Sequence, residues 1–273
     1  MSANLPSRIS RRGFVVGGAA LAGIAVVTNC SSQSSGGAGT LTAPASTSTN
    51  VPTVADATTL PLSDTSTLAP ATGAPAVYVN HGSATSNNVA LTFHLGGDPA
   101  LVVDLLDLMR AKGFTATLFA VGSWITANPK IGHRAVAAGH ELGNHTLNHT
   151  DMLTLTRAQV YDEITGGGQA LVPFIGSIGK WFRPSGTDVP SQRILDEAGR
   201  AGYAVSVGYD VDSRDFKEPG SKAVIAKVNA EVHPGAIVSM HFGHRDTIKA
   251  FPAILDHLAA NNLTQVTVSG LLG

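Results

Sequence analysis

The stretch VALTFHLGGDPALVVDLLDLMRAKG, residues 89–113, predicts a strand, a short connection and a helix in succession. Its first apolar run ends at Phe93, as is typical of a buried strand. Asp98 is suited to cap a helix and Pro99 to the first helical position, and apolar residues then recur at helical spacing up to Gly113. The stretch is therefore read as one β/α unit.

The same alternation of apolar runs and amphipathic segments continues along the chain. We expect strands at 89–93, 115–121, 141–143, 181–183, 204–208, 236–240 and 265–268. We expect helices at 99–112, 123–138, 157–172, 191–202, 221–232 and 248–261. Such alternation favours a parallel sheet covered by helices, either an open doubly wound sheet or a barrel. Because these strands are few for an eight-stranded barrel, we predict an α/β fold of the distorted (β/α)7 barrel type, with parallel strands.

The first thirty residues predict an export signal rather than part of the fold. SRRGFVV (10–16) resembles a twin-arginine signal with Arg11 and Arg12 as the pair, and an apolar run follows. That run ends near Cys30, a possible lipoprotein site, although Asn29 is larger than the residue usual before such a cysteine. An uncleaved membrane anchor would give nearly the same location. We expect an exported protein at the outer face of the cytoplasmic membrane or in the cell envelope, touching the membrane only through a lipid or signal anchor.

Composition separates a tether from one folded domain. Residues 31–75 are rich in Ser, Thr, Ala, Pro and Gly, which predicts a disordered tether because too little apolar surface can be buried. Residues 76–273 remain as a single domain. The 18 basic and 19 acidic residues are nearly balanced, which argues against a nucleic-acid partner.

Ionisable side chains are concentrated directly after the predicted strands, where parallel α/β folds carry their reactive groups. In chain order they are His94 and Asp98; Asn144, His145 and His149; Arg183; Asp210, Asp212 and Asp215; His241 and His244. Because the carboxyl ends of parallel strands meet at one edge, this pattern predicts a single reactive site there.

The segment ELGNHTLNHTDM (141–152) carries His145 and His149 at positions i and i+4. In a helical turn these imidazoles would share a face and converge on one cation, whereas in a loop they would be two surface histidines. Two imidazoles and a carboxylate form a common hydrolytic zinc set with an open position for water. Asp98 is the best carboxylate on offer, although helix capping is its other obvious role.

Three further segments are candidates with competing interpretations. Arg183 follows buried aromatic residues and would orient a carboxylate or base, or form a surface ion pair. The acidic segment 209–216 does not match the spacing of an EF-hand loop. His241 ends a strongly apolar strand and is either a core histidine or a general acid.

Together these motifs resemble the polysaccharide deacetylase family (carbohydrate esterase family 4) over most of residues 89–273. HTLNH (145–149) is similar to the family's HSxxH-type metal motif, and FRPSG (182–186) to its arginine-proline motif. DSRDF (212–216) is similar to DxxDW, and IVSMH (237–241) to the final histidine motif. The resemblance implies that residues 76–273 are the catalytic domain, with Arg183 orienting the base, His241 as general acid and Asp215 tuning it.

The first motif departs from the family. Where the family has TFDDGP, with a base followed by a metal ligand, this chain has TFHLGGDP (92–99). In one reading Asp98 binds the metal with His145 and His149 while His94 is the base. In a second, His94 is on the metal and Asp98 is the base; in a third, the site is degenerate. We favour the first, because the other motifs are kept.

The resemblance therefore implies a metal-dependent hydrolase that acts on carbon–nitrogen bonds other than peptide bonds. We expect one divalent ion, zinc with cobalt or manganese as alternatives, and a substrate such as peptidoglycan or another N-acetylglucosamine polymer. A backbone N–H of Ser185 or Gly186 is the candidate oxyanion donor. The alternatives are a catalytically inactive glycan-binding lipoprotein and an esterase for O-acetyl glycans.

Overall fold

The computed structural model describes residues 73–273. The predicted export signal, Cys30 and almost all of the predicted tether lie outside these residues. Within residues 73–273, none of the helices combines the length and the hydropathy that crossing a bilayer requires.

The central strand is β2 (Asn88–Leu95), which is longer than the sequence predicts and is buried along most of its length. It pairs in parallel with β3 (Thr117–Ala120) on one side and β7 (Ile237–His241) on the other. The sheet continues to β4 (Glu141–Asn144) beyond β3 and to β6 (Val211–Asp212) beyond β7. A short strand, β8 (Thr264–Gln265), also pairs with β2, at its amino-terminal end.

A second pair, β1 (Val77–Val79) and β5 (Val205–Val207), is joined to this sheet through Phe182. Phe182 forms parallel bridges to Asn144 and to Ser206, so it stands for the strand expected at 181–183. The strand order is thus β1, β5, Phe182, β4, β3, β2, β7, β6, all parallel. This curved parallel arrangement agrees with the predicted α/β fold.

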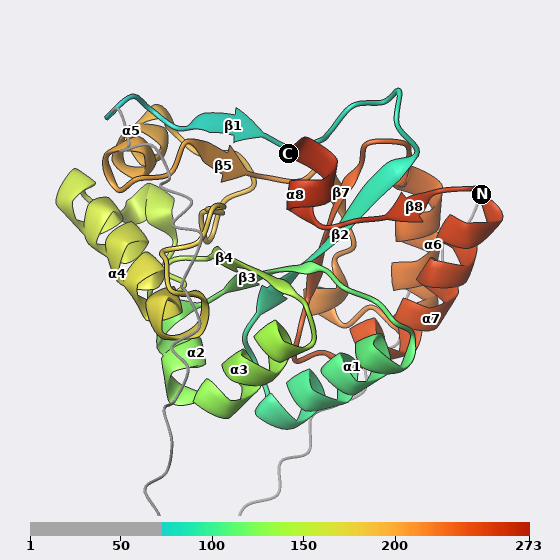
Figure 1. Ribbon diagram of the computed structural model, residues 1–273. Coiled ribbons are helices and arrows are strands. Elements are labelled where there is room, and N and C mark those ends of the chain that lie inside the picture. The colour runs from blue at the N-terminus through green and yellow to red at the C-terminus, as the bar shows by residue number, and fades with distance from the viewer. Residues whose placement is uncertain (1–72) are drawn as a thin grey trace, which may run out of the picture. The chain divides into compact units, whose positions relative to one another are not determined.

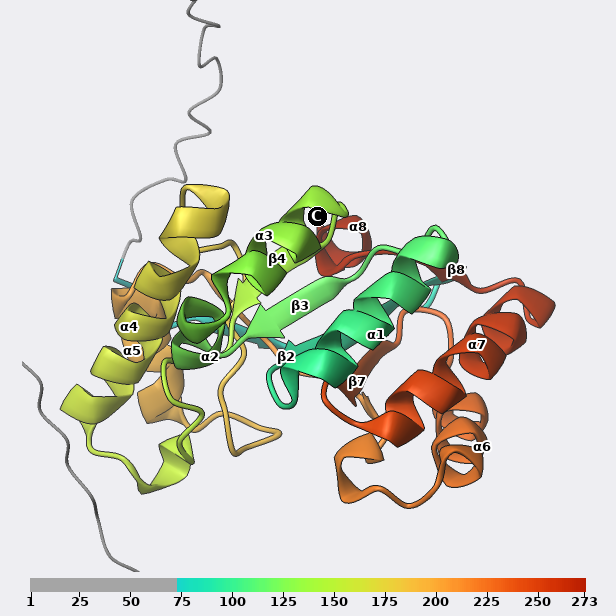
Figure 2. The same ribbon diagram turned by 90° about the horizontal axis from the view of Figure 1, so that it is seen from below.

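Helices cover the outside of the strands (Figures 1 and 2). They are α1 (Pro99–Ala111), α2 (Gly122–Ala127), α3 (Pro129–Ala137), α4 (Arg157–Ile175), α5 (Gln192–Arg200), α6 (Ser221–Glu231) and α7 (Arg245–Ala260), with 3-10 turns at Met152–Thr154 and Asp215–Lys217. The short helix α8 (Val268–Leu272) instead packs Val268 against Ala90 and Phe119, on the other face of the strands. The helix expected at 123–138 is interrupted at Asn128, because Pro129 disfavours helical geometry in the residue before it. The strand expected at 265–268 was wrong in its second half, where α8 begins.

The register of β2 sets the geometry of the reactive edge. His94 is the Cα partner of His241 on β7 and of Phe119 on β3. On the opposite face of β2, Leu91, Phe93 and Leu95 are fully buried in the main hydrophobic core. A well-packed strand therefore carries His94 directly beside the end of β7.

Candidate active site

Three imidazoles meet at the carboxyl ends of β2 and β4. One ring nitrogen from each of His94, His145 and His149 lies within 4.8 Å of the others. The ring centroids of His94 and His145 are 4.2 Å apart, and those of His145 and His149 are 4.9 Å apart. The structure thus brings together a cluster that a divalent cation can bridge.

The loop after β4, not a helical turn, places His145 and His149. The backbones of Thr146 (φ 64°) and His149 (φ 59°) are left-handed, which costs free energy for residues other than glycine. Hydrogen bonds hold this conformation: the Asn144 side chain accepts from the Thr146 N–H, and Thr146 Oγ1 accepts from the His149 N–H. The two imidazoles therefore converge as expected, but a loop conformation brings them together instead of the helical turn that their spacing suggested.

His145 has the contacts of a metal ligand. Its Nδ1 lies 2.9 Å from the carbonyl oxygen of Arg183, which can only accept, so the ring proton of neutral His145 is on Nδ1. Its Nε2 is buried without a hydrogen-bond partner among residues 73–273, and it carries the lone pair. Burial, and then the charge of His149, hold the pKa of His145 well below 6.5, which favours the neutral form that binds metals.

His94 is held differently. Arg183 Nη1 donates to His94 Nε2 over 3.2 Å, since a guanidinium group has no acceptor. In neutral His94 the proton is then on Nδ1, which is buried and has no partner among the described residues. Burial, followed by the charges of His145 and His241, keeps the pKa of His94 well below 6.5. With its lone pair engaged by Arg183, His94 is poorly arranged to act as a base.

Asp98 does not join the cluster. Its side chain is exposed and accepts a hydrogen bond from the Ala100 N–H at 2.9 Å, as the N-cap of α1. Its carboxylate is absent from the imidazole group and from the cavities beside it. The expected metal set of Asp98, His145 and His149 therefore needs correction: the loop through Gly96 and Gly97 carries Asp98 away to the helix terminus.

The Arg183 side chain is buried between the strands, beneath the cluster of His94, His145 and His149. It donates to the carbonyls of Val207 and Gly208 and to the Thr92 hydroxyl, besides His94. Burial lowers the pKa of Arg183 to about 9. The structure therefore places Arg183 where it orients His94, the residue at the position of the family's base.

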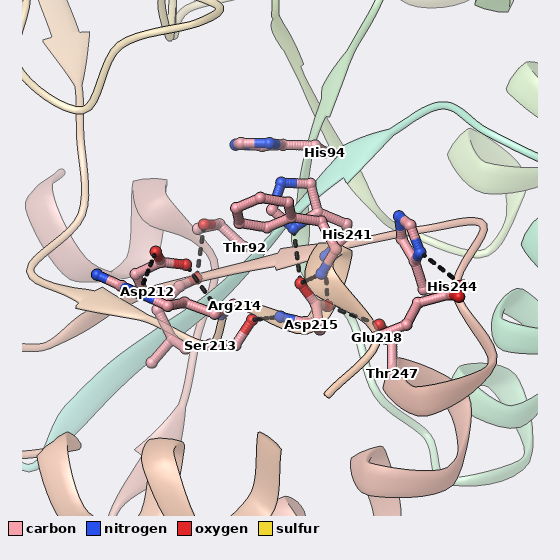
Figure 3. A network of polar contacts seen from close by, with 12 residues as sticks. Thr92, His94, Asp212, Ser213, Arg214, Asp215, Glu218, His241, His244 and Thr247 are labelled. Carbon is pink, nitrogen blue, oxygen red and sulfur yellow. Dashed lines mark hydrogen bonds and ion pairs between the residues drawn. The ribbon is translucent and has the colours of Figure 1, made fainter. Parts of the chain in front are cut away.

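On the other side of His94, His241 is paired with Asp215 (Figure 3). Asp215 Oδ1 lies 2.7 Å from His241 Nδ1, and its Oδ2 accepts from the His241 backbone and from the Thr247 hydroxyl. Burial acts to raise the pKa of Asp215, but the hydrogen bonds and charge of His241 outweigh it and hold that pKa below its ordinary value. The ionised carboxylate fixes the tautomer of His241 and leaves Nε2 free. The ring centroids of His241 and His94 are 4.4 Å apart.

A cavity of about 520 Å³ opens over the imidazoles. Its lining includes His94, His145, His149 and His241, and also Pro184, Tyr209, Arg214 and Phe216 from the segments that the sequence pointed to. It further includes Thr187, Asp188 and Lys217, which the sequence did not single out. Of the two candidate oxyanion donors, Gly186 lines the cavity and Ser185 does not. His244, which follows β7, lines it too.

Comparisons with known proteins agree with this geometry. The polysaccharide deacetylase family model matches residues 81–206. A chitooligosaccharide deacetylase of Bradyrhizobium is 32% identical over 170 residues, 62% of this chain and 77% of that protein. A peptidoglycan-N-acetylglucosamine deacetylase of Bacillus cereus is 31% identical over 188 residues, 67% of this chain and 87% of that protein.

A solved structure extends the comparison to the fold. It is a mutant, with restored enzymatic activity, of a pseudoenzyme of carbohydrate esterase family 4. It superposes with a TM-score of 0.68 at 25% identity, covering 73% of this chain and 72% of that one. This likeness confirms the predicted parallel α/β fold of the distorted barrel type. The chain belongs to the polysaccharide deacetylase family of hydrolases.

Proposed function

We propose that this protein is a metal-dependent deacetylase that removes N-acetyl groups from cell-wall or chitin-like glycans. The observation that carries the proposal is that the His94, His145 and His149 cluster and the His241–Asp215 pair face one cavity. Such a site can bind a cation, hold an acetamide and deliver a proton within a few ångströms. The similar deacetylases from Bradyrhizobium and Bacillus cereus support the glycan substrate.

We propose His94, His145 and His149 as the metal ligands, with His94 in place of the expected Asp98. The unpartnered buried Nε2 of His145 offers a lone pair to a cation, and the unpartnered Nδ1 of His94 offers one once its ring proton moves to Nε2. An imidazole set suits zinc, with cobalt as an alternative; manganese, which prefers oxygen ligands, fits less well. A zinc ion held by these residues would polarise a carbonyl oxygen and would lower the pKa of bound water to about 7, so that the water could lose its proton to solvent without a separate side-chain base.

The chain's own groups then manage the remaining protons. His241, whose Nδ1 faces Asp215, presents Nε2 to the cavity and donates a proton to the leaving amine. Gly186, at the edge of the cavity with a φ of 71°, supplies a backbone N–H toward the acetyl oxygen. Acetate and a free amino sugar are the products.

Binding without turnover is the second candidate. It is favoured by one observation: the imidazole cluster contains no carboxylate among residues 73–273, and Arg183 occupies the lone pair of His94. If the cation is bound too weakly, the lack of a carboxylate and the Arg183 hydrogen bond together leave the site without a group that can accept a proton from water. The protein would then bind glycans and release no acetate.

Acetate release from N-acetylglucosamine oligomers separates the two candidates. The zinc- or cobalt-loaded protein is expected to release acetate, and EDTA is expected to stop it, with activity returning when metal is restored. O-acetylated xylan serves as the comparison substrate, because the same tetrahedral chemistry can cleave esters. Saturable glycan binding with no acetate at any metal concentration would establish the non-catalytic candidate instead.

We predict unequal effects of two variants on zinc affinity. His94→Ala weakens zinc binding by about tenfold, a modest loss, because binding at Nδ1 moves the ring proton to Nε2, where it faces the Arg183 donor. Asp98→Ala leaves zinc binding unchanged and lowers thermal stability only, by about 1 kcal/mol for a lost N-cap. Calorimetric titration with zinc measures both. A large loss in the Asp98 variant would restore the carboxylate as a ligand.

We also propose export to the cell envelope through the twin-arginine-like signal, with Cys30 as a possible lipid attachment point. The support is the SRRGFVV sequence followed by an apolar run. Replacing Arg11 and Arg12 together by lysine is expected to retain the precursor inside the cell. Fractionation and immunoblotting test this, with Arg8→Lys as the matched control; unchanged export of the double variant would refute the proposal.

A further inference from the structure

Asn144 is the last residue of β4, at the point where the loop that carries His145 and His149 leaves the sheet. Its main chain pairs with the neighbouring segment: its N–H donates to the Trp181 carbonyl and its carbonyl accepts from the Arg183 N–H, each over 2.9 Å. Its side chain is fully buried and lines neither of the cavities beside the imidazole cluster. Any effect of this side chain on the site must therefore pass through other residues.

Both polar ends of the Asn144 amide form hydrogen bonds. Its Oδ1 accepts from the Thr146 N–H over 2.9 Å. Its Nδ2 donates to the Ile164 carbonyl over 2.8 Å and to the Tyr203 hydroxyl over 2.9 Å. These partners fix the orientation of the amide, because a backbone N–H only donates and a carbonyl only accepts. One side chain thus connects the loop after β4 to α4 and to the segment before β5.

The bond from Asn144 to Thr146 reaches a proposed metal ligand in one further step. Thr146 Oγ1 accepts from the His149 N–H over 3.2 Å. The backbones of Thr146 and His149 are both left-handed, and such backbones persist in residues with side chains only where the surrounding contacts hold them. Asn144 holds the first of these residues, and Thr146 holds the second.

Gly167 of α4 shows how closely this helix packs on the amide. A Cβ at Gly167 would overlap Asn144 Oδ1 and would lie 2.6 Å from the carbonyl carbon of Thr146. Alanine is the better helix former, so Gly167→Ala would stabilise α4 if there were room for the added methyl group. Because there is none, we expect the substitution to displace the Asn144 amide and the start of the loop.

We propose that Asn144 is a positioning residue for the metal site, acting through Thr146 on His149. This inference rests on the proposed metal ligands and adds a residue that touches neither the cation nor the glycan. The main-chain bonds of residue 144 do not need its side chain. Removing the amide therefore leaves Arg183 in place and releases only the path of the loop toward His149.

Zinc titration of a double-mutant cycle tests this route. Asn144→Ala is expected to weaken zinc binding by about tenfold, as is usual when a residue that supports a metal ligand is removed. In a His149→Ala background the same substitution is expected to cost almost nothing more, because the ligand on which it acts is already gone. Gly167→Ala, on a different element, is expected to reproduce the loss seen in Asn144→Ala.

Two further readouts separate positioning from a general loss of stability. The visible absorption spectrum of the cobalt-loaded protein reports coordination geometry and should change in Asn144→Ala. Deuterium exchange of the metal-free protein should become faster over residues 146–149 in the same variant. Leu258→Ala, at a buried position of α7, is the control: it lowers thermal stability but should keep the wild-type zinc affinity and cobalt spectrum.

Three results overturn the inference: wild-type zinc affinity in Asn144→Ala, fully additive losses in the double variant, or a cobalt spectrum that Asn144→Ala leaves unchanged. Each of them leaves the proposed metal ligands standing. A wild-type protein that binds no zinc overturns the ligands and the inference together. Zinc binding that depends on Asn144, without acetate release under any condition, supports the positioning role and refutes the deacetylase.

Discussion

Replacing His145 by alanine is expected to lower zinc affinity by at least about 100-fold and acetate release by about 1,000-fold at fixed zinc concentration. Among the proposed ligands, His145 has the most firmly set proton position, because its Nδ1 faces the Arg183 carbonyl and its Nε2 has no other partner among the described residues. No other contact in the cluster can replace that nitrogen. Zinc titration and an acetate assay measure the two losses.

Two further variants separate metal loss from misfolding. His145 is buried, so His145→Ala leaves a small void, whereas His149 is exposed and His149→Ala disturbs little else. Both variants should lose zinc. His133→Ala, an exposed histidine on α3, should keep wild-type affinity and activity. Retention of zinc by both cluster variants would show that the imidazoles do not form the metal site.

Replacing Asp215 by asparagine is expected to reduce kcat by about 10²- to 10⁴-fold with zinc affinity unchanged. The amide cannot accept from His241 Nδ1 with the strength of a carboxylate, and it favours the wrong tautomer of His241. The same carboxylate also accepts from Thr247 and from the His241 backbone, so the variant loosens the end of β7 as well.

Kinetics at several pH values distinguish a role in proton transfer from a loss of packing. If Asp215 fixes the proton position of His241, the shape of the variant's pH–rate profile differs from that of the wild type. Asp256→Asn, an exposed aspartate on α7, is the control and should match the wild type. A profile of unchanged shape, with activity lost only in proportion to folded protein, would leave Asp215 a structural role alone.

Most of the fold follows from local signals in the sequence. The unit of β2 and α1 has a continuous apolar run, an N-cap, a proline at the first helical position and a regular apolar stripe. By contrast β1 and β6 went unpredicted, because each is only two or three residues long and is formed by pairing with a distant strand. The break at Asn128 has a local signal in Pro129, but the apolar periodicity continues across it and predicts one helix.

Only part of the site could be predicted from the sequence, because the rest depends on a loop path and on tertiary packing. His145, Arg183 and His241 could be located because each ends a strand, and the edge where strands end is fixed by topology. The destination of Asp98 depends on the path of a glycine-containing loop, which the sequence leaves open. His244 and Trp124 enter the cavities only through tertiary packing of α2 and the loop after β7.

An anomalous-scattering map of zinc-loaded crystals tests the central claim directly, because it locates the ion without reference to activity. We predict one peak at about 2.0–2.1 Å from a ring nitrogen of each of His94, His145 and His149, with Asp98 still on the amino terminus of α1. A peak bonded to the Asp98 carboxylate, or no peak between the imidazoles at saturating zinc, would contradict the account.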